Sequence, residues 1–122
     1  MAKVLMSIKP EFVEAILSGE KKYEYRKVKC KKPIDRIVIY STSPIMQIVA
    51  EAEVRCIISG TPDEIWRKTH NDSGISKIFY DDYYHSSDIA YAYQLGKIIK
   101  FKKSKSLEDY GVDKAPQSFR YL

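Results

Sequence analysis

Histidine and cysteine are scarce in this sequence, with two of each among 122 residues. Cys30 and Cys56 form no paired motif and show no spacing typical of metal ligands, while His70 and His85 stand in isolated polar contexts. This usage argues against a disulfide scaffold and against a metal centre built from these residues. We therefore expect no metal, no cofactor and a reduced, cytoplasmic protein.

Long apolar runs are also missing. No stretch approaches the roughly 18 apolar residues that a membrane helix needs, and residues 1–8 are too short an apolar run for a signal peptide before Lys9 and Pro10 interrupt it. We expect no membrane span. A glycine-rich phosphate loop and a nucleophile elbow are absent as well, which sets aside two common enzyme classes.

The remaining composition is that of an ordinary globular domain, with 44% hydrophobic and 30% charged residues. A length of 122 residues suits one domain covering residues 1–122. The net charge of +5 permits partners that carry phosphate, but it does not identify them.

Hydrophobic periodicity predicts an α+β domain with five to seven strands and three helices. Strands are expected over residues 3–8, 23–27, 36–40 and 48–58, the third being central because both its faces are apolar. A first helix should begin at Pro10 and end at the left-handed stop Gly19. A second helix should begin at Thr61 and Pro62, with Glu64 at the capping-box position.

Two expectations concern the later strands. In residues 48–58, Ala50, Ala52, Val54 and Cys56 alternate with charged positions, which predicts that all four face inward. Residues 89–95 read as another strand, Gly96 as a turn, and residues 97–103 as its hairpin partner with a basic rim. A capped turn at residues 106–109 and a short last strand complete the expected sheet.

An aromatic segment follows the second helix. Helical spacing predicts that one face of a further helix contains Ile75, Ile78, Phe79 and Tyr83. The neighbouring aromatic residues either stack against a nucleobase or cover the core from the solvent side; these residues are Trp66, Tyr80, Tyr83 and Tyr84.

Residues 27–33 contain four lysines and end at Pro33, which indicates an exposed connection between strands. Such a run is either a solvated loop or a contact surface for a nucleic-acid backbone.

Residues 19–26, with the sequence GEKKYEYR, hold the most informative polar pattern. Because strand side chains alternate, Glu24 and Arg26 share one face, and Lys21 lies beside that face at the corner between helix and strand. A carboxylate between two cations would form a polar anchor for a ligand. The alternative is a solvated ladder of ion pairs on an edge strand, which would contribute little.

These residues resemble the G-x-K-x-x-E-x-R motif of the ASCH domains, which belong to the PUA-like superfamily. The resemblance continues in residues 7–10 (SIKP), 39–44 (IYSTSP) and 116–119 (PQSF), so it covers nearly the whole chain. It implies a small PUA-like β-barrel with flanking helices, and a cleft between the first helix and the barrel mouth. It also implies that the ligand is RNA, a nucleotide or a modified nucleoside.

Carried over residue by residue, the resemblance implies a set of ligand-binding side chains. The set comprises Lys9, Lys21, Glu24, Arg26, Tyr40, Ser41, Ser43 and Ser118. Arg120 is a further addition made only by analogy at the chain end. In this interpretation Lys21 and Arg26 meet phosphate or carbonyl oxygens, Glu24 accepts from a base amino group, and an aromatic ring stacks.

The resemblance also suggests enzymes. Some ASCH proteins resemble acetylcytidine amidohydrolases, in which a lysine at the position of Lys21 acts with a threonine at the position of Glu24 and a distal glutamate, for which Glu64 is the candidate here. A carboxylate at position 24 should instead favour a charged Lys21, which opposes a role as nucleophile or base. Other relatives are ribonucleases, and a protein adaptor linked to transcription is a third possibility. We favour binding over catalysis.

Overall fold

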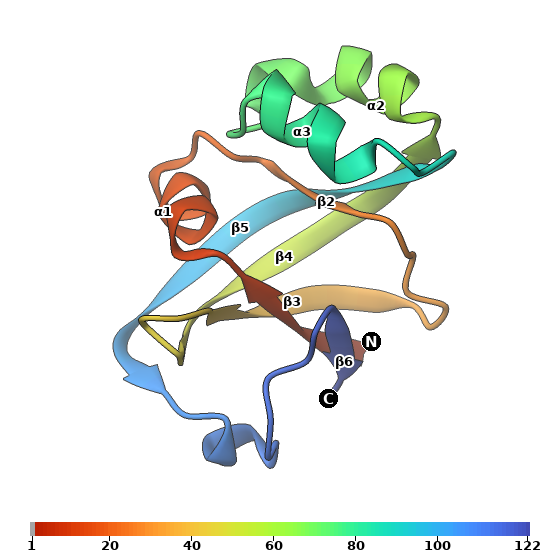
Figure 1. The fold of residues 1–122 in the computed structure, drawn as a ribbon. Helices are drawn as coiled ribbons and strands as arrows, with labels where there is room; N and C mark the ends of the chain where they lie inside the picture. The colour runs from red at the N-terminus through yellow and green to blue at the C-terminus, as the bar shows by residue number, and fades with distance from the viewer. Residues whose placement is uncertain (1) are drawn as a thin grey trace.

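The computed structural model describes residues 2–122 of the chain. One six-stranded sheet curls into a half-barrel with three α-helices against it, which confirms the predicted α+β, PUA-like architecture (Figure 1). In chain order the elements are β1 (Ala2–Ile8), α1 (Pro10–Ser18), β2 (Tyr23–Arg26), β3 (Ile34–Ser41), β4 (Gln47–Gly60), α2 (Pro62–Thr69), η1 (His70–Asp72), α3 (Lys77–Tyr84), β5 (Ala90–Lys105), η2 (Glu108–Tyr110) and β6 (Phe119–Tyr121).

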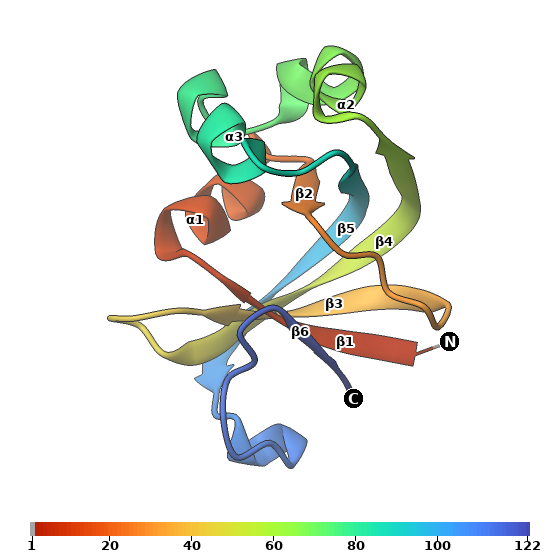
Figure 2. The ribbon, with the colours of Figure 1, turned by 45° about the vertical axis from the view of Figure 1, so that its right-hand side comes forward.

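The strand order is β2-β5-β4-β3-β1-β6, so β2 and β6 are the two edges of the sheet. Only β1 and β3 pair in parallel, and the other neighbours are antiparallel. Because the sheet curls, the edge strand β2 approaches the region where β1 ends and β6 begins, which Figure 2 shows from the side. This curl brings residues from both ends of the chain to one site.

The helix ends follow their sequence signals. Pro10 begins α1, and Gly19 ends it in a left-handed conformation with φ of 90°. At the start of α2, the Thr61 side chain accepts from the Glu64 amide, and the Glu64 carboxylate accepts from the Thr61 amide, which is the predicted capping box. Helix α1 packs against the inner face of the sheet, and α2 and α3 cover one end of the sheet (Figure 1).

The apolar residues form three clusters on the two faces of the sheet. The largest joins α1 to the inward faces of β1, β3 and β4. A second lies beneath α2 and α3 and consists mainly of aromatic side chains. The third lies on the opposite face, against the segment around η2, and includes Leu5, Val38 and Tyr40. Since β1 contributes to two clusters, it is buried on both faces, as expected of an interior strand.

The predicted inward position of Cys56 is wrong. Ala50, Ala52 and Val54 are buried, but Cys56 is exposed. The pairing between β4 and β5 shifts between Val54 and Cys56, and such an irregularity interrupts the alternation of faces along a strand.

The predicted hairpin at Gly96 is also wrong, because β5 runs without a turn from Ala90 to Lys105. Its long antiparallel partner β4 pairs with it along this length, from Gly60 opposite Ala90 to Ile48 opposite Lys105. At position 96 a Cβ atom would meet the side chains of Glu53 and Arg55, so glycine provides space there and does not reverse the chain.

The third helix turns a different face inward from the one predicted. Ile78 is 84% exposed, whereas Tyr80 and Tyr84 are buried against β2 and β5. Most of the aromatic segment therefore covers the core, with Tyr80 donating to the Pro62 carbonyl and Tyr84 to the Arg26 carbonyl. No helix among residues 2–122 is long and apolar enough to cross a membrane.

Buried tyrosines make the stability of this fold sensitive to alkaline pH. Burial raises the pKa of Tyr25 to about 12. The Tyr25 hydroxyl donates a hydrogen bond to the Thr69 hydroxyl, which in turn donates to the Ile65 carbonyl. Above pH ~10 the unfolded chain loses the Tyr25 hydroxyl proton first, so the free energy of unfolding falls as pH rises from about 10 to 12.

We expect the Tyr25→Phe variant to be less stable than wild type at neutral pH, because it lacks the hydrogen bond to Thr69. Its deficit should shrink by up to about 1.4 kcal/mol per pH unit above pH ~10. Urea unfolding at a series of pH values measures both quantities. A deficit that stays constant to pH ~11 would contradict the raised pKa.

Candidate functional site

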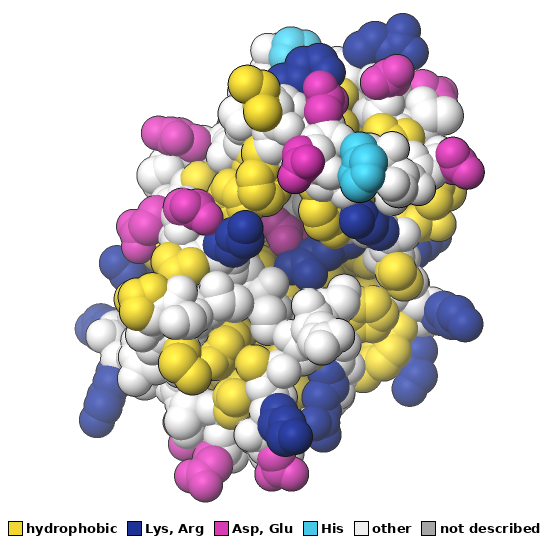
Figure 3. Space-filling model, in the orientation of Figure 1, with side chains coloured by type: hydrophobic (Ala, Val, Ile, Leu, Met, Phe, Trp, Pro, Cys, Tyr) yellow, Lys and Arg dark blue, Asp and Glu magenta, His cyan; other side chains and the backbone are white. Residues whose placement is uncertain are grey.

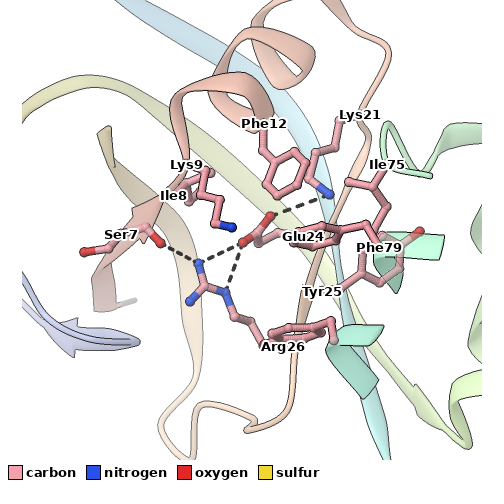
Figure 4. Close-up of a pocket in the computed structure, with 11 residues that line it drawn as sticks. Ser7, Ile8, Lys9, Phe12, Lys21, Glu24, Tyr25, Arg26, Ile75 and Phe79 are labelled. Atoms are coloured by element: carbon pink, nitrogen blue, oxygen red, sulfur yellow. Dashed lines mark hydrogen bonds and ion pairs between the residues drawn. The ribbon is translucent and has the colours of Figure 1, made fainter. Parts of the chain in front are cut away.

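Three charged side chains converge beside α1. Lys21, Glu24 and Arg26 are only 3%, 6% and 9% exposed. Glu24 lies between the two cations: Oε2 accepts from Arg26 Nε at 3.0 Å and pairs with Nη2 at 2.8 Å, and Oε1 lies 3.7 Å from Lys21 Nζ (Figure 4). The strand β2 is indeed an edge, but its charged face is buried and is not the solvated ladder of the alternative interpretation.

Arg26 also joins the two sides of the curled sheet. Its Nη2 donates to the Ser7 carbonyl in β1 at 2.9 Å, and its Nη1 donates to the Ser118 carbonyl just before β6 at 3.3 Å. Together with the bond from Nε to Glu24, these bonds engage three of the five guanidinium N–H donors, and Nη2 is also ion-paired with Glu24. Arg26 is therefore held in place by the fold itself.

Lys21 has a different environment. Its Nζ donates to the Ser73 carbonyl at 3.2 Å and lies 4.7 Å and 5.4 Å from the ring centres of Tyr25 and Phe12. Burial lowers the pKa of Lys21, and neighbouring Arg26 lowers it further, while Glu24 acts in the opposite direction. Glu24 does favour the charged ammonium, as expected, but the removal of water from the ammonium outweighs the attraction of this one carboxylate.

The segment before α3 encloses Lys21. Gly74 has φ of 64°, and a Cβ atom there would collide with the Lys21 side chain and lie 2.8 Å from its Cα atom. The neighbouring Lys22 amide donates to the Asp72 carbonyl at 2.8 Å. A left-handed glycine thus allows residues 72–74 to pass directly over Lys21 and to exclude water from it.

A cavity of about 200 Å³ opens beside this group of charges. Glu24 and Arg26 form polar lining, with Lys9 beside them, and aromatic and aliphatic side chains form the remaining wall (Figure 4). These wall residues are Ile8, Phe12, Tyr25, Ile75, Phe79 and Tyr83. Figure 3 shows a hollow on this face between the helical part and the sheet, with Lys and Arg side chains gathered around it.

The structure brings together four of the side chains that the resemblance implied: Lys9, Lys21, Glu24 and Arg26 all line the cavity. Ser118 meets the group through its backbone carbonyl, whereas its side chain is exposed, as is that of Arg120.

Tyr40, Ser41 and Ser43 do not belong to the cavity lining. Tyr40 packs in the cluster on the opposite face with Leu5 and Val38, because alternate residues of β3 point to opposite sides. Ser41 is buried at the end of β3, opposite Ile8, and Ser43 is exposed in the following turn.

Sequence reasoning missed most of the apolar wall. Phe12 was expected only as part of the core stripe of α1, yet its ring packs edge-on against Phe79 with 5.0 Å between ring centres. Phe79 lies under the Lys9 ammonium at 5.0 Å. The sequence did indicate an apolar face on each of the two helices. It did not indicate that these faces meet at the cavity, because that depends on how α1 and α3 pack.

Other groups considered for catalysis lie elsewhere. Glu64 is bound in the capping box of α2 and does not line the cavity. His70 and His85 are exposed and are also absent from its lining. Within residues 2–122 there is no group of three or more His, Cys, Asp or Glu side chains that could hold a metal ion.

A curled mixed sheet, an N-terminal helix beside its open side and a polar cavity between them define a PUA-like domain. The chain matches the ASCH domain family over residues 6–103 and belongs to that family.

Relatives support this assignment. The chain is 32% identical over 120 residues to large ribosomal subunit protein uL22 of Ureaplasma parvum serovar 3, covering 98% of this chain and 39% of that protein. It is 30% identical over 94 residues to an ASCH domain-containing ribonuclease of Zymomonas mobilis, covering 76% of this chain and 64% of that protein. The crystal structure of ASCH from Zymomonas mobilis is similar, with a TM-score of 0.89 at 26% identity, covering 98% of this chain and 87% of that one.

The contact between Gly74 and Lys21 can be tested with a matched glycine. Gly74 and Gly111 have φ of 64° and 70°, but a Cβ atom at Gly111 meets nothing within 4 Å. Gly111→Ala should therefore cost only the left-handed strain of about 1–2 kcal/mol. Gly74→Ala should cost about 1–3 kcal/mol more, because backbone must shift. Equal losses in urea unfolding would contradict the close packing over Lys21.

Proposed function

We propose that this domain binds single-stranded RNA by taking one unpaired base into the cavity beside Glu24. The observation that carries the proposal is the combination of a buried carboxylate with aromatic walls in one small hollow. Unstacked bases are recognised in this way, by hydrogen bonds to their polar edges and by stacking on aromatic side chains. The relative named as a ribonuclease adds support for RNA as the partner.

The size of the cavity favours a single base. Its volume of about 200 Å³ lies below the roughly 300–1,000 Å³ of pockets that enclose drug-sized ligands. A flat ring fits this space better than a complete nucleotide, so sugar and phosphate would stay outside. Lys9, exposed beside the polar lining, is placed to meet the phosphate.

The hydrogen-bonding capacity of Glu24 suggests which bases fit. Oε2 already accepts a hydrogen bond from Arg26 Nε and is ion-paired with Nη2, whereas Oε1 has the Lys21 ammonium only at 3.7 Å and can still accept a hydrogen bond. A base with an exocyclic amino group supplies that donor. Uracil offers one ring N–H between two carbonyl oxygens, which a carboxylate repels. We therefore expect cytosine or a purine to be preferred over uracil.

The proposal also revises the roles of the two cations. Most Arg26 donors are occupied by Glu24 and by backbone carbonyls, so Arg26 orients Glu24 and does not contact phosphate. Lys21 lines the cavity but is packed against Phe12, Tyr25 and Ser73, so in this binding mode it acts on the base mainly through Glu24.

Binding can be tested with one pair of variants on α3. Phe79→Ala removes a wall of the cavity, and Ile78→Ala removes a neighbouring side chain that is 84% exposed. Loss of one base stack costs about 1–3 kcal/mol, so Phe79→Ala should weaken binding at least about 5-fold in fluorescence anisotropy with a single-stranded oligoribonucleotide. Ile78→Ala should bind as wild type does.

Equal affinity of both α3 variants would overturn the base pocket. The same titration with oligocytidine and oligouridine tests the role assigned to Glu24, and tighter binding of oligouridine would contradict that role.

A ribonuclease activity is the second candidate, and the lowered pKa of Lys21 favours it. A less basic lysine is more often uncharged near neutral pH and can accept a proton. In this mechanism Lys21 takes the proton of a ribose 2′-hydroxyl, whose oxygen attacks the adjacent phosphorus. The bond from phosphorus to the 5′-oxygen breaks, the 5′-oxygen takes a proton from water, and a 2′,3′-cyclic phosphate remains.

Cleavage is tested by incubating the protein with an oligoribonucleotide and with a DNA strand of the same sequence. We expect products with cyclic phosphate ends from RNA alone, because DNA lacks the 2′-hydroxyl. Lys21→Met should abolish cleavage while largely preserving binding, since its side chain has similar length and suits a buried position. Cleavage of DNA, or full activity of Lys21→Met, would contradict this mechanism.

A further inference from the structure

A second surface, outside the cavity, is formed by the loop between β2 and β3. Four exposed lysines lie in residues 27–33: Lys27, Lys29, Lys31 and Lys32. Two tyrosine hydroxyls fix the backbone between them. Tyr93 in β5 accepts from the Cys30 amide at 3.0 Å and donates to the Val28 carbonyl at 3.1 Å. The loop is thus tied to the sheet at its centre.

The second tyrosine fixes the end of the loop. Tyr121 in β6 accepts from the amides of Lys31 and Lys32 at 2.9 and 3.2 Å, and the Lys32 ammonium lies 4.9 Å from its ring centre. Because the hydroxyls of Tyr93 and Tyr121 form hydrogen bonds with backbone atoms of the loop, these bonds fix the path of the loop. Its lysines are presented on a fixed support.

Two adjoining hollows flank this loop. One, of about 480 Å³, is lined by Lys27, Lys29 and Lys31 together with Tyr91. The other, of about 340 Å³, is lined by Lys29, Lys31, Lys32 and Arg55. No Asp or Glu lines either hollow, and within residues 2–122 none of these four lysines forms an ion pair. We call Lys27, Lys29, Lys31, Lys32 and Arg55 the basic track.

The basic track begins at the mouth of the base cavity. The Lys27 ammonium lies 4.7 Å from the ring centre of Tyr83, and Tyr83 lines that cavity. Lys29 and Lys31 line both hollows, so the cationic surface continues from Tyr83 towards Arg55. Figure 1 shows the loop on the right, leading from β2 towards β3.

We propose that the basic track binds the sugar–phosphate backbone of a single-stranded nucleic acid whose base occupies the cavity. This inference rests on the proposed function. The four lysines form no ion pairs within residues 2–122, although Arg55 pairs with Glu53 at 3.6 Å, so the row of lysines matches a polyanion in charge. Cationic grooves of this kind follow the backbone in proteins that bind single strands. The five residue steps from Lys27 to Lys32 span at most about 17 Å, which accommodates several phosphates.

Salt dependence is the measurement that isolates the basic track. Each phosphate neutralised on a single strand contributes about 0.7 to the slope of log affinity against log salt concentration. The test variant is Lys29→Gln with Lys31→Gln. The control is Lys102→Gln with Lys103→Gln, which removes the same charge from exposed positions near the end of β5, drawn at the lower left in Figure 1.

Each protein is titrated with a labelled strand of about 12 nucleotides and with an abasic strand of the same length. We expect the track variant to reduce the slope by about 1.4 with both strands, and the control to leave it unchanged. Equal slopes for wild type and the track variant would overturn the inference. If Phe79→Ala still weakened binding in that case, the base cavity would stand alone.

The opposite result is equally informative. The salt slope could depend on the basic track while the strand with bases and the abasic strand bind equally tightly and Phe79→Ala has no effect. That result would support the backbone site and contradict the base cavity. An oligoglutamate with the same charge as the abasic strand serves as a competitor. If it competes as strongly as the abasic strand does, the assignment to nucleic acid is overturned and an acidic protein partner is indicated.

Discussion

The structure depends on the burial of three charges, Lys21, Glu24 and Arg26, around one strand of four residues. Moving each ion out of water costs several kcal/mol, and a buried pair recovers this only with good geometry and further hydrogen bonds. Arg26 has those bonds; Lys21 has fewer, and burial lowers its pKa. Replacement of buried ion pairs by well-packed apolar side chains is often neutral or stabilising in proteins, so stability alone does not explain three buried charges here. We infer that the charges are kept for what they present to the cavity.

The same charges explain how an open sheet becomes a half-barrel. The edges β2 and β6 share no ladder of backbone hydrogen bonds, and Arg26 connects them instead through the carbonyls of Ser7 and Ser118. Tyr121 adds a second connection to the loop after β2. The cavity is therefore built where the sheet is closed by side chains, so positioning of Glu24 and closure of the fold are one arrangement.

Much of this arrangement was predictable from local sequence, because its causes are local. The period of two in β2 placed Glu24 with Arg26, and Pro10 and Gly19 marked the ends of α1. The errors arise where distant segments decide. The exposure of Cys56 follows from irregular pairing with β5, and the continuity of β5 through Gly96 follows from its partner β4. The apolar wall could not be predicted because it forms where α1 packs against α3. The lowered pKa of Lys21 could not be predicted because it depends on burial by the segment at Gly74, which passes over the side chain. Neither contact leaves a periodic signal in the sequence.

The two surfaces beside Tyr83 differ in a way that assigns them different tasks. In the cavity Glu24 lies between Lys21 and Arg26, so the proposed recognition of a base would depend on short contacts to buried groups. Along the basic track the four lysines form no ion pairs within residues 2–122, and only Arg55 is offset, by Glu53, so the field of the lysines extends over about a Debye length and falls with added salt. In the proposed binding mode, attraction of a polyanion and discrimination among its bases would be separated in space, and the two surfaces meet at the contact between Lys27 and Tyr83. A strand held by its backbone on the track would present its bases at the cavity mouth, which raises their local concentration there without requiring a tight pocket.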